Sequence, residues 1–191
     1  MGLDIDIRVN NYDEIFTDDY HDEKNDYFHK HNLSRTFCNF ICRQNVISHE
    51  AELDQIGRIT GVDIASIYEM ENYPDDEGLE FFLEMAESEE EKQNILKGAE
   101  ENKVELQSNI DQVLLTVAKL IEKLSPIDNL PSLLLPTDFD TLQNEEYFSE
   151  FNIDKGDGYI GNNFGQDLRN FQRFLEFAKA NGTTTVWFGY G

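Results

Sequence analysis

The feature that most restricts the fold is a run of apolar residues at helical spacing that lies between Ser88 and Pro126. Isoleucine, valine and leucine recur every three or four positions from residue 110 to residue 124, and this spacing places them on one face of a helix. Ser88 with Glu91 has the form of a capping box, and Pro126 cannot continue a helix. We therefore predict one long helix over residues 88–124. Its apolar stripe covers about two heptads, which favours packing within a helical body over an extended coiled coil.

Two segments far apart in the sequence have the pattern of β-strands. Residues 3–9 alternate apolar and polar side chains, and residues 183–188 are mainly β-branched and aromatic. We expect the two strands to pair with each other and to pack on helices, because a two-stranded sheet alone is only marginally stable. The predicted fold is α+β, mostly α-helical, with this small sheet formed by the N- and C-terminal strands. It forms a single domain over residues 1–191.

Capping residues predict where two other helices begin. Ser34 caps a helix over residues 34–43, and Asn162 or Asn163 caps a helix over residues 164–180. Residues 10–32 are polar and aromatic, and we expect a loop there with short helical turns. The chain is therefore predicted to consist mainly of helices that are joined by loops of unequal length.

The net charge is −24, from 39 Asp and Glu against 15 Lys and Arg. Such a surface repels nucleic acid phosphates and anionic lipid headgroups, so we expect no direct binding to DNA, RNA or membranes. The charge is uneven: residues 51–100 carry −12, whereas residues 151–191 are neutral. Between Arg58 and Lys92 there are twelve acidic residues and no basic one. An acidic helical region over about residues 50–125 thus precedes a neutral Gly-rich loop, helix and strand.

An acid-only stretch of this length favours a contact surface for a basic partner. We expect a non-enzymatic interaction protein that binds a basic macromolecule, such as a nucleic-acid-binding protein, and inhibits it by imitating nucleic acid, as phage counter-defence proteins do. A solvated face that only keeps the protein soluble is the alternative, but the net charge exceeds the range of about 2–8 that solubility asks of a small domain. The predicted partner-binding residues are Asp63, Glu69, Glu71, Asp75, Asp76, Glu77, Glu80, Glu84 and Glu87.

A second hypothesis is a metal site between residues 18 and 42. Two histidines precede two cysteines that lie one helical turn apart, and these side chains could complete a tetrahedral zinc site. Buried cysteines that pack as small apolar residues are the alternative. The proposed zinc ligands are His29, His31, Cys38 and Cys42, and no other cofactor is expected. The acids and histidines of residues 18–31 also suggest a metal-dependent enzyme or metal-binding module that uses a hard divalent cation.

A third hypothesis places a small anion or a nucleotide at the Gly-rich segment over residues 154–165. A Gly-rich loop that opens a helix can hold an anion with its backbone N–H groups. The segment lacks the preceding strand of a dinucleotide-binding unit, and its match to a calcium loop fails at the ligand positions. The ligand-binding residues expected there are Asn162, Asn163, Arg169 and Arg173. No nucleophile signature occurs in the sequence, so we assign no catalytic residue.

The N-terminal sequence bears on compartment and on relatives. Asp4 and Asp6 stand where a signal peptide needs basic and apolar residues, no stretch is apolar enough to span a membrane, and the two cysteines are too few for a disulfide framework. We therefore expect a cytoplasmic protein. The opening Met-Gly-Leu-Asp, followed by alternating apolar residues, resembles that of a loose group of uncharacterised bacterial and phage proteins. This resemblance implies a mostly helical body and a bacterial or phage source.

Overall fold

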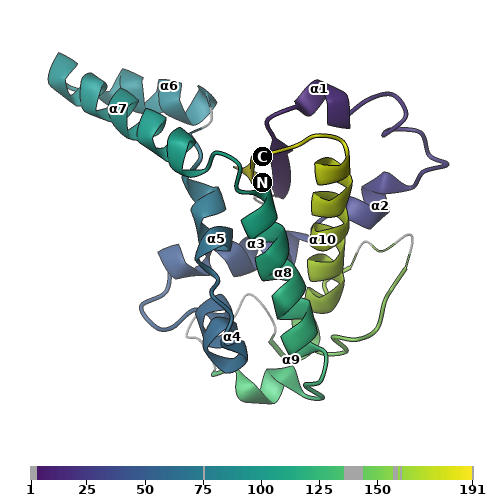
Figure 1. The fold of residues 1–191 in the computed structure, drawn as a ribbon. Coiled ribbons are helices and arrows are strands. Elements are labelled where there is room, and N and C mark those ends of the chain that lie inside the picture. The colour runs from purple at the N-terminus through teal and green to yellow at the C-terminus, as the bar shows by residue number, and fades with distance from the viewer. Residues whose placement is uncertain (1–3, 75, 136–143, 157–158, 160, 191) are drawn as a thin grey trace.

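The computed structural model describes residues 4–74, 76–135, 144–156, 159 and 161–190. Helices dominate this part of the chain, together with a two-stranded sheet, and the predicted α+β, mostly α-helical class is confirmed (Figure 1). None of the described helices is long and apolar enough to cross a membrane. The elements are β1 (Ile5–Val9), α1 (Tyr12–Ile15), α2 (Tyr27–His31), α3 (Arg35–Cys42), η1 (Arg43–Asn45), α4 (Glu52–Thr60), α5 (Ala65–Glu69), η2 (Met70–Asn72), α6 (Asp76–Met85), α7 (Glu89–Glu105), α8 (Ile110–Leu124), η3 (Leu130–Leu133), α9 (Asn144–Tyr147), α10 (Phe164–Ala180) and β2 (Val186–Tyr190).

The two strands pair with each other, as the sequence predicts. They are antiparallel, and the register runs from Ile5 opposite Tyr190 to Val9 opposite Val186. Every second side chain of β1 is buried, because successive side chains of a strand point to opposite faces. The buried face of the sheet therefore closes one side of the helical body.

Helices α8 and α10 pack side by side at the centre of the molecule (Figure 1). Val113, Val117 and Leu120 of α8 are fully buried, and so are Phe171 and Leu175 of α10. Full burial of each such side chain contributes roughly 1.5–3 kcal/mol, against which the loss of chain entropy must be set. The apolar periodicity of both segments thus reflects their contact in the core.

Helix α3 joins the sheet to a second, aromatic part of the core. The ring of Phe40 lies 5.0 Å from that of Phe164 and 5.8 Å from that of Phe148. On the other side, the Phe37 ring lies 6.4 Å from the ring of Phe188 in β2. Aromatic rings at these separations add to the stabilisation that burial provides. The helix that Ser34 is predicted to cap therefore has its apolar face covered from both sides.

The prediction of one continuous helix over residues 88–124 is wrong. The chain leaves α7 and enters α8 through a turn in which Ser108 has a φ of 63°. The N–H of Ser108 donates to the hydroxyl of Thr185 over 3.1 Å, and the Asn109 side chain bonds to both the N–H and the carbonyl of Val186 at 2.8 Å. These bonds to the start of β2 turn the chain. Only the segment after the turn carries the apolar stripe that enters the core.

Replacing Ser108 with glycine should stabilise the protein by about 0.5–1 kcal/mol. Left-handed backbone costs a non-glycine residue roughly 1–2 kcal/mol, and the greater freedom of glycine in the unfolded chain offsets part of that gain. Urea unfolding measures the difference. As a control, Gln107→Gly should destabilise, because no positive φ is found at that neighbouring exposed position. A lower unfolding midpoint for Ser108→Gly would contradict strain at the turn.

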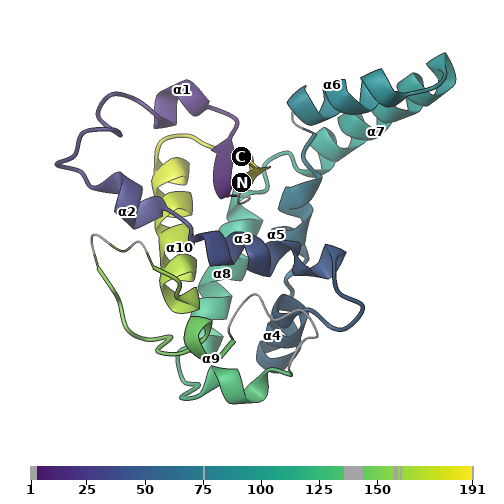
Figure 2. The same cartoon turned by 180° about the vertical axis from the view of Figure 1, so that it is seen from behind.

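Helices α6 and α7 form a hairpin that projects from the body of the molecule (Figure 1, Figure 2). No side chain of α7 is buried, and none of the described side chains of α6 is buried either. We call residues 76–105 the arm. The arm is held together mainly by contacts between its own two helices, since none of its described side chains is buried in the core.

Three polar side chains of α10 are completely buried, those of Gln166, Asp167 and Asn170. The carboxylate of Asp167 accepts hydrogen bonds from the backbone N–H of Ser34 at 2.9 Å, from the Ser34 hydroxyl at 2.6 Å and from the Tyr147 hydroxyl at 2.9 Å. Burial raises the pKa of Asp167 to about 7, and the donors from Ser34 and Tyr147 lower it by less than burial raises it. This network ties the start of α3 and the end of α9 to α10.

An ion pair between Arg43 and Glu52 is also buried. The guanidinium donates to both carboxylate oxygens, at 3.1 and 2.9 Å, and the two side chains are only 2% and 0% exposed. The pair connects η1, directly after α3, to the first turn of α4. It therefore fixes how these two helices pack.

Candidate functional site

Side-chain caps fix the turn at the far end of the arm. The hydroxyl of Ser88 accepts the N–H of Glu91 at 3.1 Å, and the Glu91 carboxylate accepts the N–H of Glu87 at 2.8 Å. This is the capping box predicted at Ser88, except that the carboxylate reaches the residue before the cap. The caps hold the start of α7 close to the end of α6.

At its base, the arm is anchored to β2. The ring of Tyr73, which precedes α6, stacks on Trp187 of β2 with the ring centroids 3.9 Å apart. Asn102 of α7 donates to the carbonyl of Asn72 over 3.2 Å. Both contacts lie near the sheet, so the base of the arm is fixed while its tip extends into solvent.

Large apolar side chains remain exposed on the arm. Phe81, Phe82 and Met85 of α6 are 57%, 59% and 65% exposed, and Leu96 and Val104 of α7 are exposed as well. The two phenylalanine rings lie 5.8 Å apart, edge to face, and no other described aromatic ring contacts them. Apolar side chains that gather on a surface in this way mark sites of interaction.

A groove lies where the arm meets the body, and we call it the arm groove. Its apolar part has a volume of about 380 Å³ and is lined by, among others, Tyr73, Leu79, Phe82, Ile95 and Ala99. Its acidic part has a volume of about 300 Å³ and is lined by Glu69, Asn72, Asn102, Glu105 and Leu106. The two parts share Asn72 and Asn102, so an apolar hollow directly adjoins a pair of carboxylates.

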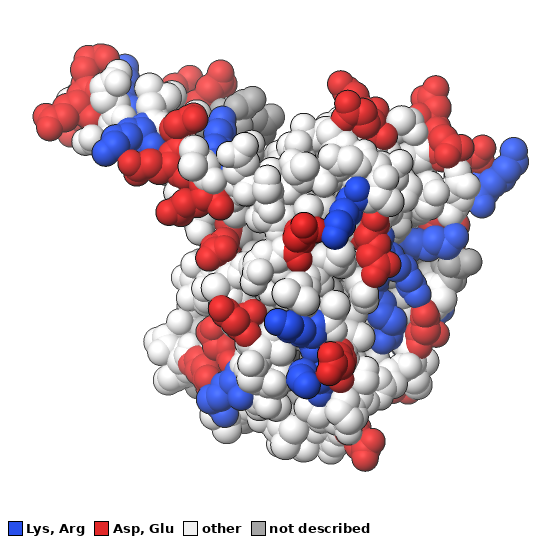
Figure 3. Space-filling model, viewed as in Figure 1, with Lys and Arg blue, Asp and Glu red and all other residues white. Residues whose placement is uncertain are grey.

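The arm is strongly acidic. Residues 76–105 include eleven Asp and Glu and three Lys, and Figure 3 shows more acidic than basic side chains on the arm. Two of the lysines form ion pairs along α7, Lys92 with Glu89 at 3.3 Å and Lys97 with Glu101 at 3.5 Å. The excess of carboxylates gives the surroundings of the arm groove a negative potential.

Some of the predicted partner-binding acids lie on or beside the arm. Glu80, Glu84 and Glu87 are exposed on it, and Glu69 lines the acidic part of the arm groove. Asp63 is exposed next to α5, where its carboxylate accepts an N–H of the first turn at 3.1 Å. The structure therefore brings Glu69 to the arm groove but does not gather all these acids into one row.

Glu71 has a role within the body instead. Its carboxylate accepts hydrogen bonds from Gln44 at 3.3 Å, Asn45 at 3.2 Å and the Tyr190 hydroxyl at 3.0 Å. It thus joins η2 to η1 and to β2. Three other predicted residues lie wholly or partly outside the described part of the chain. They are Asp75 and the side chains of Asp76 and Glu77.

Sequence reasoning missed part of the arm groove. Glu105, Asn72 and Asn102 were not predicted, and neither were the exposed rings of Phe81 and Phe82. The available signal was the apolar spacing of residues 79–86, which predicts an amphipathic helix. That spacing does not reveal that much of the apolar face stays uncovered.

The predicted zinc ligands occupy separate places. They are His29, His31, Cys38 and Cys42. The cysteines are neighbours on α3, where Cys38 is fully buried and hydrogen bonding to it lowers the pKa of Cys42. The histidines lie on α2. Across the described ranges, no three His, Cys, Asp or Glu side chains gather so that they could hold a metal ion.

The two histidines have other partners. Nδ1 of His29 bonds to the carboxylate of Asp26, and Nδ1 of His31 lies 3.1 Å from the Tyr20 hydroxyl. Burial lowers the pKa of His31 to about 4, so this imidazole is neutral at neutral pH. The segment over residues 18–31 therefore packs as an aromatic wall with an acidic outer surface.

Both arginines predicted to bind an anion are engaged within the protein. Arg169 donates to the carbonyl oxygens of Phe151 and Ile153 over 2.8 and 2.7 Å. Arg173 donates to the carboxylate of Asp154 over 2.7 Å. These bonds hold the segment before α10 against the helix.

The two asparagines of the same hypothesis differ in position. Asn163 is buried and is the one of the two predicted residues that caps α10, because its side chain accepts the N–H of Gln166 at 3.0 Å. Asn162 is exposed. Residues 157–158 and 160 of the Gly-rich segment lie outside the described part of the chain.

An exposed aromatic ring, that of Phe82, a hollow and the carboxylates of Glu69 and Glu105 meet at the arm groove, which makes it the candidate functional site. No protein-family model, curated protein or solved structure matches the chain.

Proposed function

We propose that the chain is a non-enzymatic interaction protein whose arm binds a basic segment of a macromolecular partner. The observation that carries this proposal is the arm groove, in which an apolar hollow adjoins the carboxylates of Glu69 and Glu105. Such a groove fits a protein segment that presents an apolar side chain next to a lysine or arginine.

The exposed apolar side chains of the arm supply affinity in this proposal. Covering Phe81, Phe82 and Met85 would remove apolar surface from water, which is favourable by roughly 25 cal/mol per Å². Aromatic residues at the centre of an interface commonly provide most of its binding energy. The arm has this surface available because it projects from the body and buries no described side chain.

The acidic residues of the arm supply attraction at longer range. A negative surface speeds the encounter with a positive partner, and salt weakens this effect because it screens charges beyond about 10 Å at 0.1 M. Charge therefore determines how fast the partner arrives. The apolar contacts determine how long it stays.

The partner in this proposal is a nucleic-acid-binding protein, and the arm acts as an inhibitor by imitating nucleic acid. Eleven acidic residues on a projecting hairpin favour insertion into a basic channel. A channel occupied by the arm would exclude its nucleic acid. Phage counter-defence is a setting in which such inhibitors act.

Two changes to the arm groove should each weaken binding of a helical peptide made of leucine and lysine by about tenfold, or 1.4 kcal/mol. The first, Glu69→Lys with Glu105→Lys, removes the attraction at the acidic part. The second, Gly98→Leu, fills the apolar part, because a Cβ at this position meets no atom within 4 Å. Leucine also favours helix over glycine by roughly 0.8–1 kcal/mol, so this variant should remain folded. Fluorescence anisotropy of the labelled peptide at low salt measures both effects.

The matched control is Glu145→Lys with Glu146→Lys, which makes the same change in net charge at exposed positions of α9. It should leave binding nearly unchanged. Equal weakening by the control and the arm variant would mean that the peptide is attracted by net charge alone, and the proposal would fail. A peptide of lysine and serine with the same charge should bind less tightly, since it lacks the apolar anchor.

A further inference from the structure

We propose that the outer edge of β1 binds an extended peptide segment of a partner protein, which adds a third strand to the sheet. The edge is the side of β1 that faces away from β2. This second binding site is separate from the arm and does not depend on the function proposed for the arm.

One edge of β1 carries backbone groups that no described residue pairs. In the described part of the chain, β2 is the only strand bonded to β1. The N–H of Asn10 donates to the carbonyl of Thr185 at 3.2 Å, which shows that even-numbered residues direct their backbone groups toward β2. The N–H and carbonyl groups of Ile5 and Ile7 therefore point to the outer edge. They present the hydrogen-bonding pattern that an added strand needs.

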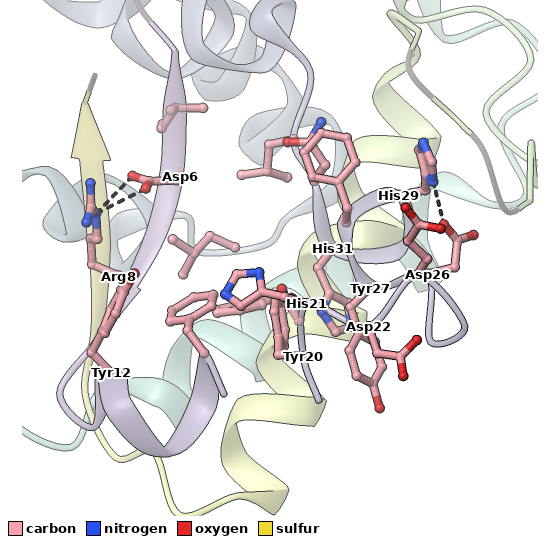
Figure 4. Close-up of a pocket in the computed structure, with 18 residues that line it drawn as sticks. Asp6, Arg8, Tyr12, Tyr20, His21, Asp22, Asp26, Tyr27, His29 and His31 are labelled. Carbon is pink, nitrogen blue, oxygen red and sulfur yellow. Dashed lines mark hydrogen bonds and ion pairs between the residues drawn. The ribbon is translucent and has the colours of Figure 1, made fainter. Parts of the chain in front are cut away.

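Two adjoining hollows follow this edge. Their volumes are about 670 and 450 Å³, and both are lined by Ile5, Asp6, Phe28, Asn32 and Leu33. Figure 4 shows the larger hollow between β1 and the residues of α2 and the loop before it, on the side opposite β2. We call the two hollows together the edge groove. It extends along β1 from Asp4 to Arg8, so an extended segment of about five residues, roughly 17 Å long, would fit along it.

The charged residues of β1 do not block this edge. Charges on an edge strand commonly prevent pairing with another chain. Here Arg8 donates to Asp6 over 3.1 Å, and the pair lies over Gly189 of β2, where a Cβ would come within 2.5 Å of both side chains. The ion pair thus lies on one face of the sheet and is directed toward β2. The pair therefore lies away from the outer edge.

The wall opposite β1 is already formed without a partner. The rings of Tyr20, Tyr27 and His31 stack, with neighbouring centroids 5.1 Å apart on either side of Tyr27. The buried Asn170 of α10 supports this wall, because its side chain donates to the carbonyls of His29 in α2 and of Asn32 at the C-cap of α2, both at 2.9 Å. A groove with fixed walls loses little entropy when a ligand enters, which favours affinity.

The lining of the edge groove indicates the chemistry of the occupant. Tyr12 and Phe28 are exposed aromatic residues, and the carboxylates of Asp22 and Glu23 line the larger hollow. Apolar side chains of an added strand would pack on the aromatic rings. Basic side chains would reach the carboxylates or lie over ring faces. The occupant is therefore an extended segment in which apolar residues alternate with Lys or Arg.

Peptides selected from a random displayed library provide the probe. Selection uses the full chain with Phe81→Ser and Phe82→Ser, so that peptides specific for the arm are not recovered. Two versions of a selected peptide are then made. One carries N-methyl groups on its odd-numbered backbone nitrogens, and the other carries them on its even-numbered ones. One set should weaken binding by about tenfold or more, because it removes the donors that face β1, and the other should change it by about twofold or less. Fluorescence anisotropy measures both, and the protein itself is unchanged.

A second measurement locates the bound peptide. In NMR spectra of the full wild-type chain, the amide signals of Ile5 and Ile7 should shift and exchange more slowly with solvent when the peptide binds. Failure to select any peptide, equal effects of the two N-methylated sets, or shifts confined to residues away from β1 would each overturn the proposal. None of these outcomes depends on whether the arm binds a basic partner.

Discussion

Replacing Glu52 with alanine should lower the free energy of unfolding by about 3–5 kcal/mol. Its carboxylate accepts two hydrogen bonds from Arg43 at 3.1 and 2.9 Å, and water has almost no access to either side chain. The variant leaves the guanidinium in the same enclosed place without this carboxylate. The guanidinium then loses two charge-assisted hydrogen bonds, which is costly because water does not reach this place to replace them. Urea unfolding followed by circular dichroism at neutral pH measures the loss.

The matched control is Glu50→Ala. Glu50 also pairs with an arginine, Arg58, at 2.8 Å, but this pair lies on the surface. Surface pairs contribute little, so the unfolding midpoint should move far less than for Glu52→Ala. Similar shifts for the two variants would show that burial adds nothing to the Arg43–Glu52 pair. Replacing both partners, as Arg43→Met with Glu52→Leu, should restore most of the stability, because the buried guanidinium is then removed together with the carboxylate.

The replacement of Asp167 with asparagine should change how stability depends on pH. Burial raises the pKa of Asp167 to about 7 in the folded chain, from an ordinary value of 3.8. The folded state therefore holds this proton more tightly than the unfolded state does. The resulting stabilisation is fully present below about pH 4 and is lost as the pH rises through about 7. Over that interval the loss is on the order of 4 kcal/mol, at 1.36 kcal/mol per pH unit of difference in pKa.

The asparagine side chain introduced by Asp167→Asn keeps the shape of the carboxyl group and carries no charge. Its oxygen can accept the N–H of Ser34, and its NH₂ group can donate to the hydroxyls of Ser34 and Tyr147 after these rotate. The difference in unfolding free energy between Asp167→Asn and wild type should thus shift in favour of the variant between pH 4 and pH 7. Other acids cancel in this difference. A difference that stays constant across the interval would mean that Asp167 ionises at its ordinary pKa.

Local signals in the sequence predicted much of the fold. Ser34, Ser88 and Asn163 each accept a backbone N–H at the start of the predicted helix, because a cap depends only on residues a few positions apart. The alternation of residues 3–9 predicted a strand for a similar reason. We predicted that this strand pairs with β2 because the sequence has no other strand pattern.

Features that depend on distant contacts could not be predicted. The break between α7 and α8 is made by hydrogen bonds from Ser108 and Asn109 to Thr185 and Val186. No sequence pattern near residue 108 predicts these bonds. The partners of the arginines in α10 were also not predictable from the sequence. Whether Arg169 meets an anion or a backbone carbonyl depends on the path of the segment over residues 150–156, which the side chain itself helps to set.

The sequence predicted the acidic charge of the candidate site but not its shape. The acid-only stretch led to Glu69, Glu80 and Glu84 because composition is visible directly in the sequence. The hollow was not visible, since it depends on the angle at which the arm leaves the body at Tyr73 and on the side chains of α6 that α7 leaves uncovered. Composition therefore suggested the type of partner that we propose, and the structure adds the place at which we propose that it binds.

The pairing of β1 with β2 also imposes an order on assembly. Asn10 and Thr185, which meet beside the sheet, are 175 residues apart in the sequence. During synthesis, β1 leaves the ribosome before the helical body, and its partner strand is made only after almost all of that body. Until then both edges of β1 are unpaired, and contacts of such long range form slowly. The sheet that borders the edge groove is consequently incomplete until β2 has been made, so a partner that recognises this groove would distinguish the folded chain from a nascent chain that lacks β2.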